Sequence, residues 1–166
     1  MLTVSLLLCA LMALAGADGE CQSADPHVLP AAPAPSCSEG WSEHNGRCFQ
    51  FVPREMSWAD AEKNCLTLKG NLASVHSVEE YQFIQAMITA QTQASPSTWV
   101  GGSDCQQNNV WFWSDGKVFS FTFWCSGEPE DRFGNQSCLQ MNHGGENCWD
   151  DTVCSNTLPS VCAVDL

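Results

Sequence analysis

The amino-acid sequence predicts an α+β fold, with two helices followed by short antiparallel strands and long disulfide-stapled loops. The first half of the chain contains two runs with helical spacing and capping residues. The second half contains short runs rich in tryptophan and phenylalanine, separated by Gly, Asn, Asp and Ser. Eleven cysteines in 166 residues would be a liability in a reducing cytosol, so they predict a secreted, disulfide-bonded domain.

The first 36 residues are expected to lie outside the folded domain. Residues 2–14 form an apolar run that ends in Ala15, Gly16 and Ala17, which is typical of a signal peptide over residues 1–17. The run is too short to cross a bilayer, so we expect no membrane insertion. Four prolines among alanines then predict an extended Pro/Ala-rich tail over residues 18–36. The folded, extracellular domain is expected over residues 37–166.

A hairpin and two helices are predicted next. Asn45-Gly46 lies between apolar runs and is the turn signal of a hairpin that extends to Phe51. Ser57 is the expected N-cap of the first helix, which Gly70 ends. Ser77 and Glu80 form a capping box for the second helix. The expected apolar face of the second helix comprises Val78, Tyr81, Phe83, Ile84 and Met87.

The rest of the chain is predicted to form short strands and loops. The β-prone runs are residues 99–102, 111–113 and 119–124. The stretch from 102 to 151 has few helix signals, and a long irregular segment in a compact domain is usually functional or held by disulfides or metals. We therefore expect any binding site to lie in this stretch.

Charge and motifs exclude two function classes. Only 6 Lys and Arg oppose 19 Asp and Glu, a net charge of −13, which excludes a protein that tracks nucleic-acid phosphates. No nucleophile motif such as G-x-S-x-G is present, and paired acids in such a domain more often hold a cation, so we expect no enzyme.

Two short acidic segments carry the residues of chemical interest. They contribute Glu128, Glu130 and Asp131 from one segment and Asp150 and Asp151 from the other. A hard cation such as Ca²⁺ needs six to eight oxygen ligands, several of them from carboxylates. Composition alone favours the other interpretation, a solvated acidic surface in a strongly acidic chain.

The order of these motifs resembles that of a C-type lectin-like domain over residues 37–162. The motifs are Gly40-Trp41, Cys48-Phe49, Trp58-Ala59-Asp60-Ala61-Glu62 with Cys65, Asn71-Leu72-Ala73-Ser74-Val75-His76-Ser77, Trp99-Val100-Gly101, Trp111-Phe112-Trp113-Ser114-Asp115-Gly116, Glu128-Pro129-Glu130, Trp149-Asp150-Asp151, Cys154 and Cys162. The sequences of residues 1–6, 101–105, 124–125 and 148–151 more narrowly resemble those of fish lectins and the related type II antifreeze proteins.

The resemblance also implies a disulfide pattern that spacing alone cannot choose. The implied pairs are Cys37–Cys48, Cys65–Cys162, Cys138–Cys154 and Cys125–Cys148. Cys9 would leave with the signal peptide. In the antifreeze-like group a cysteine like Cys105 pairs with one half of an adjacent Cys-Cys, but that position is Ser137 here. Cys105 and Cys21 either bond to each other, or one or both bridge to another chain as a disulfide-linked homodimer. A free buried thiol is the less favoured alternative outside the cell.

In sugar-binding members of the family, a Ca²⁺ ion is coordinated at positions that match five residues of this chain. The resemblance therefore implies the ligand set Glu128, Glu130, Gln136, Asp150 and Asp151, with Pro129 after a cis peptide bond. Glu130 and Asp150 stand where the family usually has amides that donate to the sugar, and an ionised carboxylate cannot donate a hydrogen bond. Only Gln136 keeps an amide.

Two further residues of the same loop bear on ligand binding. Phe133 either stacks on a galactose-like ring or packs on the domain. Asn135-Gln136-Ser137 is an N-glycosylation sequon, and a glycan on Asn135 would obstruct the site.

The favoured function is that of a secreted, calcium-dependent lectin that binds glycans, of galactose or mannose type. The first alternative is an ice-binding antifreeze protein on the same fold. Residues 131–135 contain no threonine, although threonines lie beside the triplet in the calcium-dependent antifreeze members. The second alternative is a lectin-like domain that binds proteins and no sugar.

Overall fold

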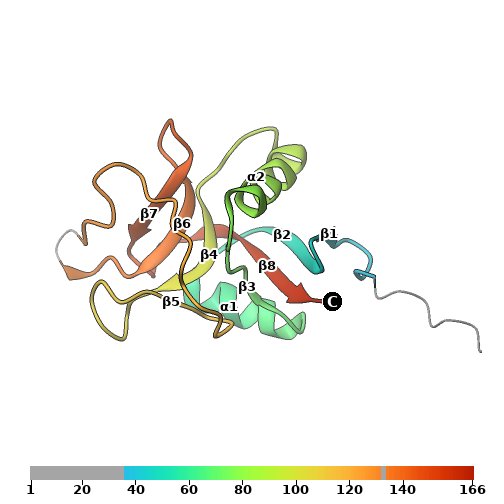
Figure 1. Ribbon diagram of the computed structural model, residues 1–166, viewed down its shortest axis with the longest axis horizontal. Coiled ribbons are helices and arrows are strands. Elements are labelled where there is room, and N and C mark those ends of the chain that lie inside the picture. The colour runs from blue at the N-terminus through green and yellow to red at the C-terminus, as the bar shows by residue number, and fades with distance from the viewer. Residues whose placement is uncertain (1–35, 132–133) are drawn as a thin grey trace, which may run out of the picture. The chain divides into compact units, whose positions relative to one another are not determined.

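The computed structural model describes residues 36–131 and 134–166, and Figure 1 shows their arrangement. The signal peptide predicted over residues 1–17, nearly all of the predicted tail, Cys21 and Phe133 lie outside the described residues. The domain boundaries therefore stay predictions.

The predicted hairpin is present. Strands β1 (Ser42–His44) and β2 (Arg47–Met56) pair antiparallel, with Ser42 opposite Phe49. Asn45 and Gly46 join them with φ angles of 49° and 76°. Both central residues at positive φ are what a two-residue hairpin turn requires, which explains why Asn-Gly is such a strong turn signal.

Both helices begin at the predicted residues. The side chain of Ser57 accepts a hydrogen bond from Asp60 N at the start of α1 (Trp58–Thr67), and Ser77 accepts one from Glu80 N at the start of α2 (Val78–Thr92). These bonds satisfy backbone N–H groups that the first turn of a helix leaves unpaired.

Two details of the helices differ from the prediction. The left-handed residue after α1 is Lys69, with φ 65°, rather than Gly70. Gly70 is needed for a different reason, because a Cβ at that position would lie 2.4 Å from the carbonyl oxygen of Ala163 in the neighbouring strand. Val78 belongs to the first turn of α2 but is 37% exposed, so it is not part of the buried face.

One sheet of eight strands organises the described residues (Figure 1). Its main path runs β1-β2-β8-β4-β6-β7, with β3 on β8 and β5 on β4. Every pair is antiparallel except β4 with β8, which meet in parallel at Trp99 and Ser160. The remaining strands are β3 (Asn71–Leu72), β4 (Thr98–Ser103), β5 (Phe112–Trp113), β6 (Cys138–His143), β7 (Cys148–Thr152) and β8 (Leu158–Asp165).

The run 119–124 was predicted to be β-prone but forms no strand. Its only ladder contact is an isolated bridge between Trp124 and Trp149. The run is held by aromatic rings instead, since Phe119, Phe121 and Trp124 all have ring centroids within 6.0 Å of that of Trp149. The aromatic side chains that suggested a strand are therefore used for packing, which does not require a regular backbone ladder.

The core divides into two clusters that place the helices on the sheet. The larger cluster includes Ile84 of α2, Phe49 and Trp149, and the smaller one includes Ala61 of α1 and Trp99. In Figure 1, α2 and α1 lie above and below the central strands. Among the residues that the structure describes, four disulfides are formed, and they are the four pairs that the resemblance implies: Cys37–Cys48, Cys65–Cys162, Cys125–Cys148 and Cys138–Cys154.

Candidate functional site

Three carboxylates from two segments converge in the long-loop half of the domain. Glu128, Asp150 and Asp151 each place one carboxylate oxygen so that all three oxygens lie within 4.8 Å of one another. Asp150 and Asp151 lie on β7 and are only 6% and 0% exposed, whereas Glu128 lies on the loop before the cis peptide bond to Pro129. We call these three residues the acidic cluster.

Backbone N–H groups of the loop hold the carboxylate of Asp151. Asp151 Oδ1 accepts from Glu130 N at 3.1 Å, and Oδ2 accepts from Asp131 N at 3.0 Å. The same loop is tied to β7 at its start, where the Cys125–Cys148 disulfide and a bond from Cys125 N to Trp149 O join the two segments. The buried Asp151 side chain therefore fixes the loop that carries Glu128.

Asp150 is held from the neighbouring strand. Gln140 lies opposite Asp150 in the β6–β7 register, and its Nε2 donates to Asp150 Oδ2 at 2.6 Å. His143 Nδ1 lies 3.1 Å from the same oxygen. Neither Gln140 nor His143 was predicted from the sequence as a partner of Asp150. Both residues lie on β6, and they reach Asp150 through the pairing of β6 with β7. The sequence does not specify the register of that pairing.

The other residues of the implied ligand set lie around this cluster. Glu130 is exposed, and its N–H also donates to Glu128 Oε2 at 3.0 Å. Gln136 Nε2 donates to the backbone oxygen of Asp151 at 2.7 Å, so the one remaining amide is already bonded within the protein. Asn135 is exposed, and Phe133 lies outside the described residues.

Burial and neighbouring negative charge raise carboxyl pKa values in the acidic cluster. Burial raises the pKa of Glu128 above the ordinary carboxyl range, and the negative charges of Asp150, Glu130 and Asp151 raise it further. Burial also raises the pKa of Asp151, against the effect of the backbone N–H groups that bond to it. Among the described residues, no lysine or arginine forms an ion pair with Glu128 or Asp151.

This arrangement is chemically suited to a hard divalent cation. Ca²⁺ is bound by carboxylate, amide and backbone oxygens, and it neutralises the repulsion that raises carboxyl pKa values. The acidic cluster supplies three of these oxygens. Glu130 and Gln136 are the other members of the implied ligand set in the same loop.

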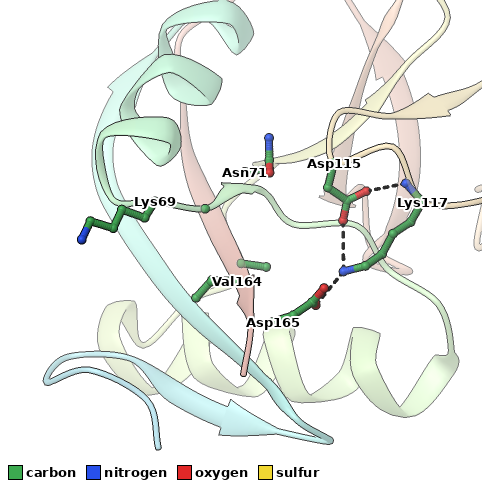
Figure 2. Close-up of a pocket in the computed structure, with 8 residues that line it drawn as sticks. Lys69, Asn71, Asp115, Lys117, Val164 and Asp165 are labelled. Carbon is green, nitrogen blue, oxygen red and sulfur yellow. Dashed lines mark hydrogen bonds and ion pairs between the residues drawn. The ribbon is translucent and has the colours of Figure 1, made fainter. Parts of the chain in front are cut away.

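A second group of charged side chains lies near a pocket of about 150 Å³ between Lys69 and the end of β8. Figure 2 shows Lys117 between the carboxylates of Asp115 and Asp165, at 3.4 and 2.7 Å, while Lys69 points away from them. Arg47 Nη1 lies 2.5 Å from Glu80 Oε1, and both residues are buried. We call Arg47, Glu80, Asp115, Lys117 and Asp165 the Arg47 cluster.

The family model described as "Lectin C-type domain" matches residues 54–164 of the chain. The chain is 41% identical to ladderlectin of Oncorhynchus mykiss, with 96% of this chain and 91% of that protein covered. It is 44% identical to the type-2 ice-structuring protein of Hemitripterus americanus, with 99% of each covered. These relatives are lectins and ice-structuring proteins, families of binding proteins, and the chain is a non-enzymatic protein of the same kind.

A similar solved structure is that of a Ca²⁺-dependent type II antifreeze protein in its Ca²⁺-free form. It is 41% identical in sequence, the match covers 77% of this chain and 99% of that one, and the TM-score is 0.72. Within residues 36–131 and 134–166, no helix has the length and apolar character needed to cross a membrane.

Proposed function

The chain belongs to the C-type lectin domain family, and we propose that it is a secreted lectin that binds glycans through a calcium ion held by the acidic cluster. One observation carries the calcium part of the proposal. Three carboxylate oxygens converge within 4.8 Å of one another, and the pKa values of Glu128 and Asp151 are raised by burial and by like charge. A bound divalent cation removes both penalties.

The carboxylates at this site set the expected mode of sugar binding. A sugar with two neighbouring hydroxyls would place both on the calcium ion and donate hydrogen bonds to ligand carboxylates. Glu130 and Asp150 can only accept hydrogen bonds when ionised, and Gln136 already donates to Asp151 O. The site therefore favours a ligand that donates hydrogen bonds to the protein over one that accepts them.

Secretion is supported by the disulfides. Four disulfides occur among the described residues, and disulfides persist in oxidising compartments such as the extracellular space. The apolar run at residues 2–14 supplies the matching export signal. The exposed Asn135 lies in the loop next to the acidic cluster, so glycosylation of its sequon is expected to reduce ligand access.

Ice binding is the second candidate, and the 44% identity to an ice-structuring protein over 99% of both chains favours it. An ice-binding surface requires a flat patch of small hydroxyl and methyl groups. The loop beside the acidic cluster instead carries Asp131-Arg132-Phe133-Gly134-Asn135. This composition supports the glycan proposal over the ice proposal.

A glycan array probed with the secreted protein in calcium and in EDTA tests the proposal. We expect selective binding that EDTA abolishes and that calcium restores. The double variant Glu128→Gln, Asp151→Asn should not bind, whereas Glu55→Gln, which removes one exposed charge on β2, should bind as the wild type does. Absence of glycan binding together with shaping of ice crystals in a chilled droplet would favour the ice-binding alternative.

A further inference from the structure

Three sulfur atoms lie in contact at the start of β6. Cys105 is a free and exposed thiol, and its Sγ lies 3.7 Å from the Sγ of Cys154. Cys154 is bonded to Cys138, and the Sγ atoms of all three cysteines lie within 4.8 Å of one another. The thiol is therefore in contact with a disulfide rather than isolated on the surface.

Several hydrogen bonds keep Cys105 in this position. Its Sγ lies 3.7 Å from the backbone oxygen of Ser137, and its N–H donates to Ser103 Oγ at 3.2 Å. Ser103 Oγ and the N–H of the neighbouring Asp104 both donate to the same Ser137 oxygen, at 2.9 and 3.2 Å. The segment that carries the thiol is thus fixed to the residue that precedes Cys138.

We propose that Cys105 exchanges with the Cys138–Cys154 disulfide, so that the protein exists as two disulfide isomers. The Cys105 thiol loses its proton to solvent, its exposed side chain turns into line with the Cys138–Cys154 bond, and the thiolate attacks Cys154 Sγ. The Cys105–Cys154 bond forms, the Cys138–Cys154 bond breaks, and Cys138 leaves as a thiolate that takes up a proton. One disulfide and one thiol are present before and after the step, so it needs no oxidant or reductant.

Exposure determines which sulfur is attacked, and burial of the leaving sulfur determines how fast the exchange is. Cys154 is partly exposed, whereas Cys138 is 0% exposed, so an incoming thiolate reaches Cys154. The leaving thiolate of Cys138 forms in an apolar core cluster, where burial disfavours the charged sulfur. Burial of this leaving thiolate slows the exchange. Because the structure holds the Cys138–Cys154 bond, we expect this isomer to be the major form and the Cys105–Cys154 isomer to be the minor form.

The two isomers fix different segments beside the acidic cluster. The major isomer links the start of β6, two residues after Gln136, to the chain that follows β7. The minor isomer would instead link the loop after β4 to that chain. Asn108 of this loop donates to Asp131 at 3.0 Å, so the exchange would change which segment supports the loop next to Asp151.

Disulfide mapping of the full chain, expressed through a secretory pathway, tests the exchange. Wild-type protein is incubated at mildly alkaline pH without added thiol, quenched in acid, unfolded, blocked with a maleimide in acid and digested without reduction. We expect a major species with Cys138–Cys154 and blocked Cys105, and a minor species with Cys105–Cys154 and blocked Cys138. The minor species should be lost in Cys105→Ser.

A second variant tests whether the fold accommodates the new bond. In Cys138→Ser, we expect Cys105 and Cys154 to be joined in the secreted protein. The proposal is overturned if the wild type yields neither blocked Cys138 nor a Cys105–Cys154 bond, whether or not Cys21 is blocked. It is also overturned if Cys105 is bonded to Cys21 or to a second chain, or if Cys105 and Cys154 stay unbonded in Cys138→Ser.

Discussion

The acidic cluster and the Arg47 cluster contain the same kinds of carboxylates but differ in their charge balance. In the Arg47 cluster, Arg47 lies against Glu80. Lys117 lies between Asp115 and Asp165 (Figure 2). Hydrogen bonding to Lys117 lowers the pKa of Asp165. In the acidic cluster the pKa values of Glu128 and Asp151 are raised instead. Among the described residues, the carboxylates of the first cluster are paired with cations, whereas Glu128 and Asp151 of the second have no lysine or arginine partner, which is the basis for proposing a bound cation there.

The largest effect on the free energy of unfolding is expected from removing the charge of Arg47, the buried cation of the Arg47 cluster. Arg47 is 8% exposed, donates to Ser74 O and Glu80, and lies 4.8 Å from the centroid of the Phe49 ring. Arg47→Met keeps an apolar stem but leaves the buried Glu80 without its cation. We expect a loss of about 3–5 kcal/mol in the free energy of unfolding, measured by urea denaturation with the disulfides intact.

Arg54→Met is the matched control for this substitution. Arg54 is exposed, and among the described residues its guanidinium donates hydrogen bonds only to Met56 Sδ and Asn64 Oδ1. Its loss should cost less than about 1 kcal/mol. If Arg47→Met lowers the free energy of unfolding no more than Arg54→Met does, Arg47 does not stabilise the buried carboxylate of Glu80.

A smaller effect is expected from completing the acidic cluster with calcium. A ligand that binds only the folded state stabilises it by about 2.7 kcal/mol at 100 times its dissociation constant. Calcium at that excess should raise the urea midpoint of the wild type and of Glu55→Gln relative to EDTA. The double variant Glu128→Gln, Asp151→Asn should show no such rise, and a rise of equal size in it would mean that calcium binds elsewhere.

The two clusters should also respond to pH in opposite directions. In EDTA, the raised pKa values of Glu128 and Asp151 mean that the folded state holds these protons more tightly than the unfolded chain. Their stabilising contribution is present below the ordinary carboxyl pKa of about 4 and is lost as the pH rises through the folded values. Asp165, with a lowered pKa, contributes above the ordinary range and loses its contribution as the pH falls.

Unfolding free energies measured in EDTA across this pH range test the opposite slopes. Subtracting the curve of Glu128→Gln, Asp151→Asn from that of the wild type should give a difference that falls as the pH rises. The corresponding difference for Asp165→Asn should rise with pH. If both differences in unfolding free energy rise with pH, or both fall, the two clusters do not respond to pH in opposite directions and the contrast between them is wrong.

The smallest effect is expected at the exposed edge of the Arg47 cluster. The side chains of Lys117 and Asp165 are 33% and 61% exposed, so water screens their interaction. Lys117→Met should reduce the unfolding free energy by less than about 1 kcal/mol and should raise the pKa of Asp165, measured by NMR titration. If Lys117→Met lowers the unfolding free energy as much as Arg47→Met does, the exposed ion pairs of the cluster stabilise the fold as much as the buried pair does.

Local signals made much of the first half of the fold predictable. The Asn45-Gly46 turn and the caps at Ser57 and Ser77 depend on residues within four positions of one another, and all three are present. The prediction of Gly70 as the helix terminator was incomplete, because its role depends on Ala163, 93 residues later in the chain. The prediction that residues 119–124 are β-prone did not yield a strand for a similar reason, because the distant Trp149 determines how the rings of this run pack.

The candidate site was predictable only in part. Composition favoured a solvated acidic surface, and only the family resemblance grouped Glu128 with Asp150 and Asp151. Gln140 and His143 reach Asp150 through the β6–β7 register, which the sequence does not specify. Arg47 was missed because its partners Glu80, Asp115 and Asp165 are distributed over the chain and meet only in the folded state.

Calorimetric titration of calcium into protein stripped with EDTA tests the central claim most directly. We predict one calcium ion per chain at the acidic cluster, bound equally by the wild type and by Glu55→Gln. Affinity should fall by more than about 100-fold in Glu128→Gln, Asp151→Asn, because even changes outside the ligand set typically cost about 10- to 100-fold. Absence of binding by the wild type, or unchanged affinity in the double variant, would contradict the account.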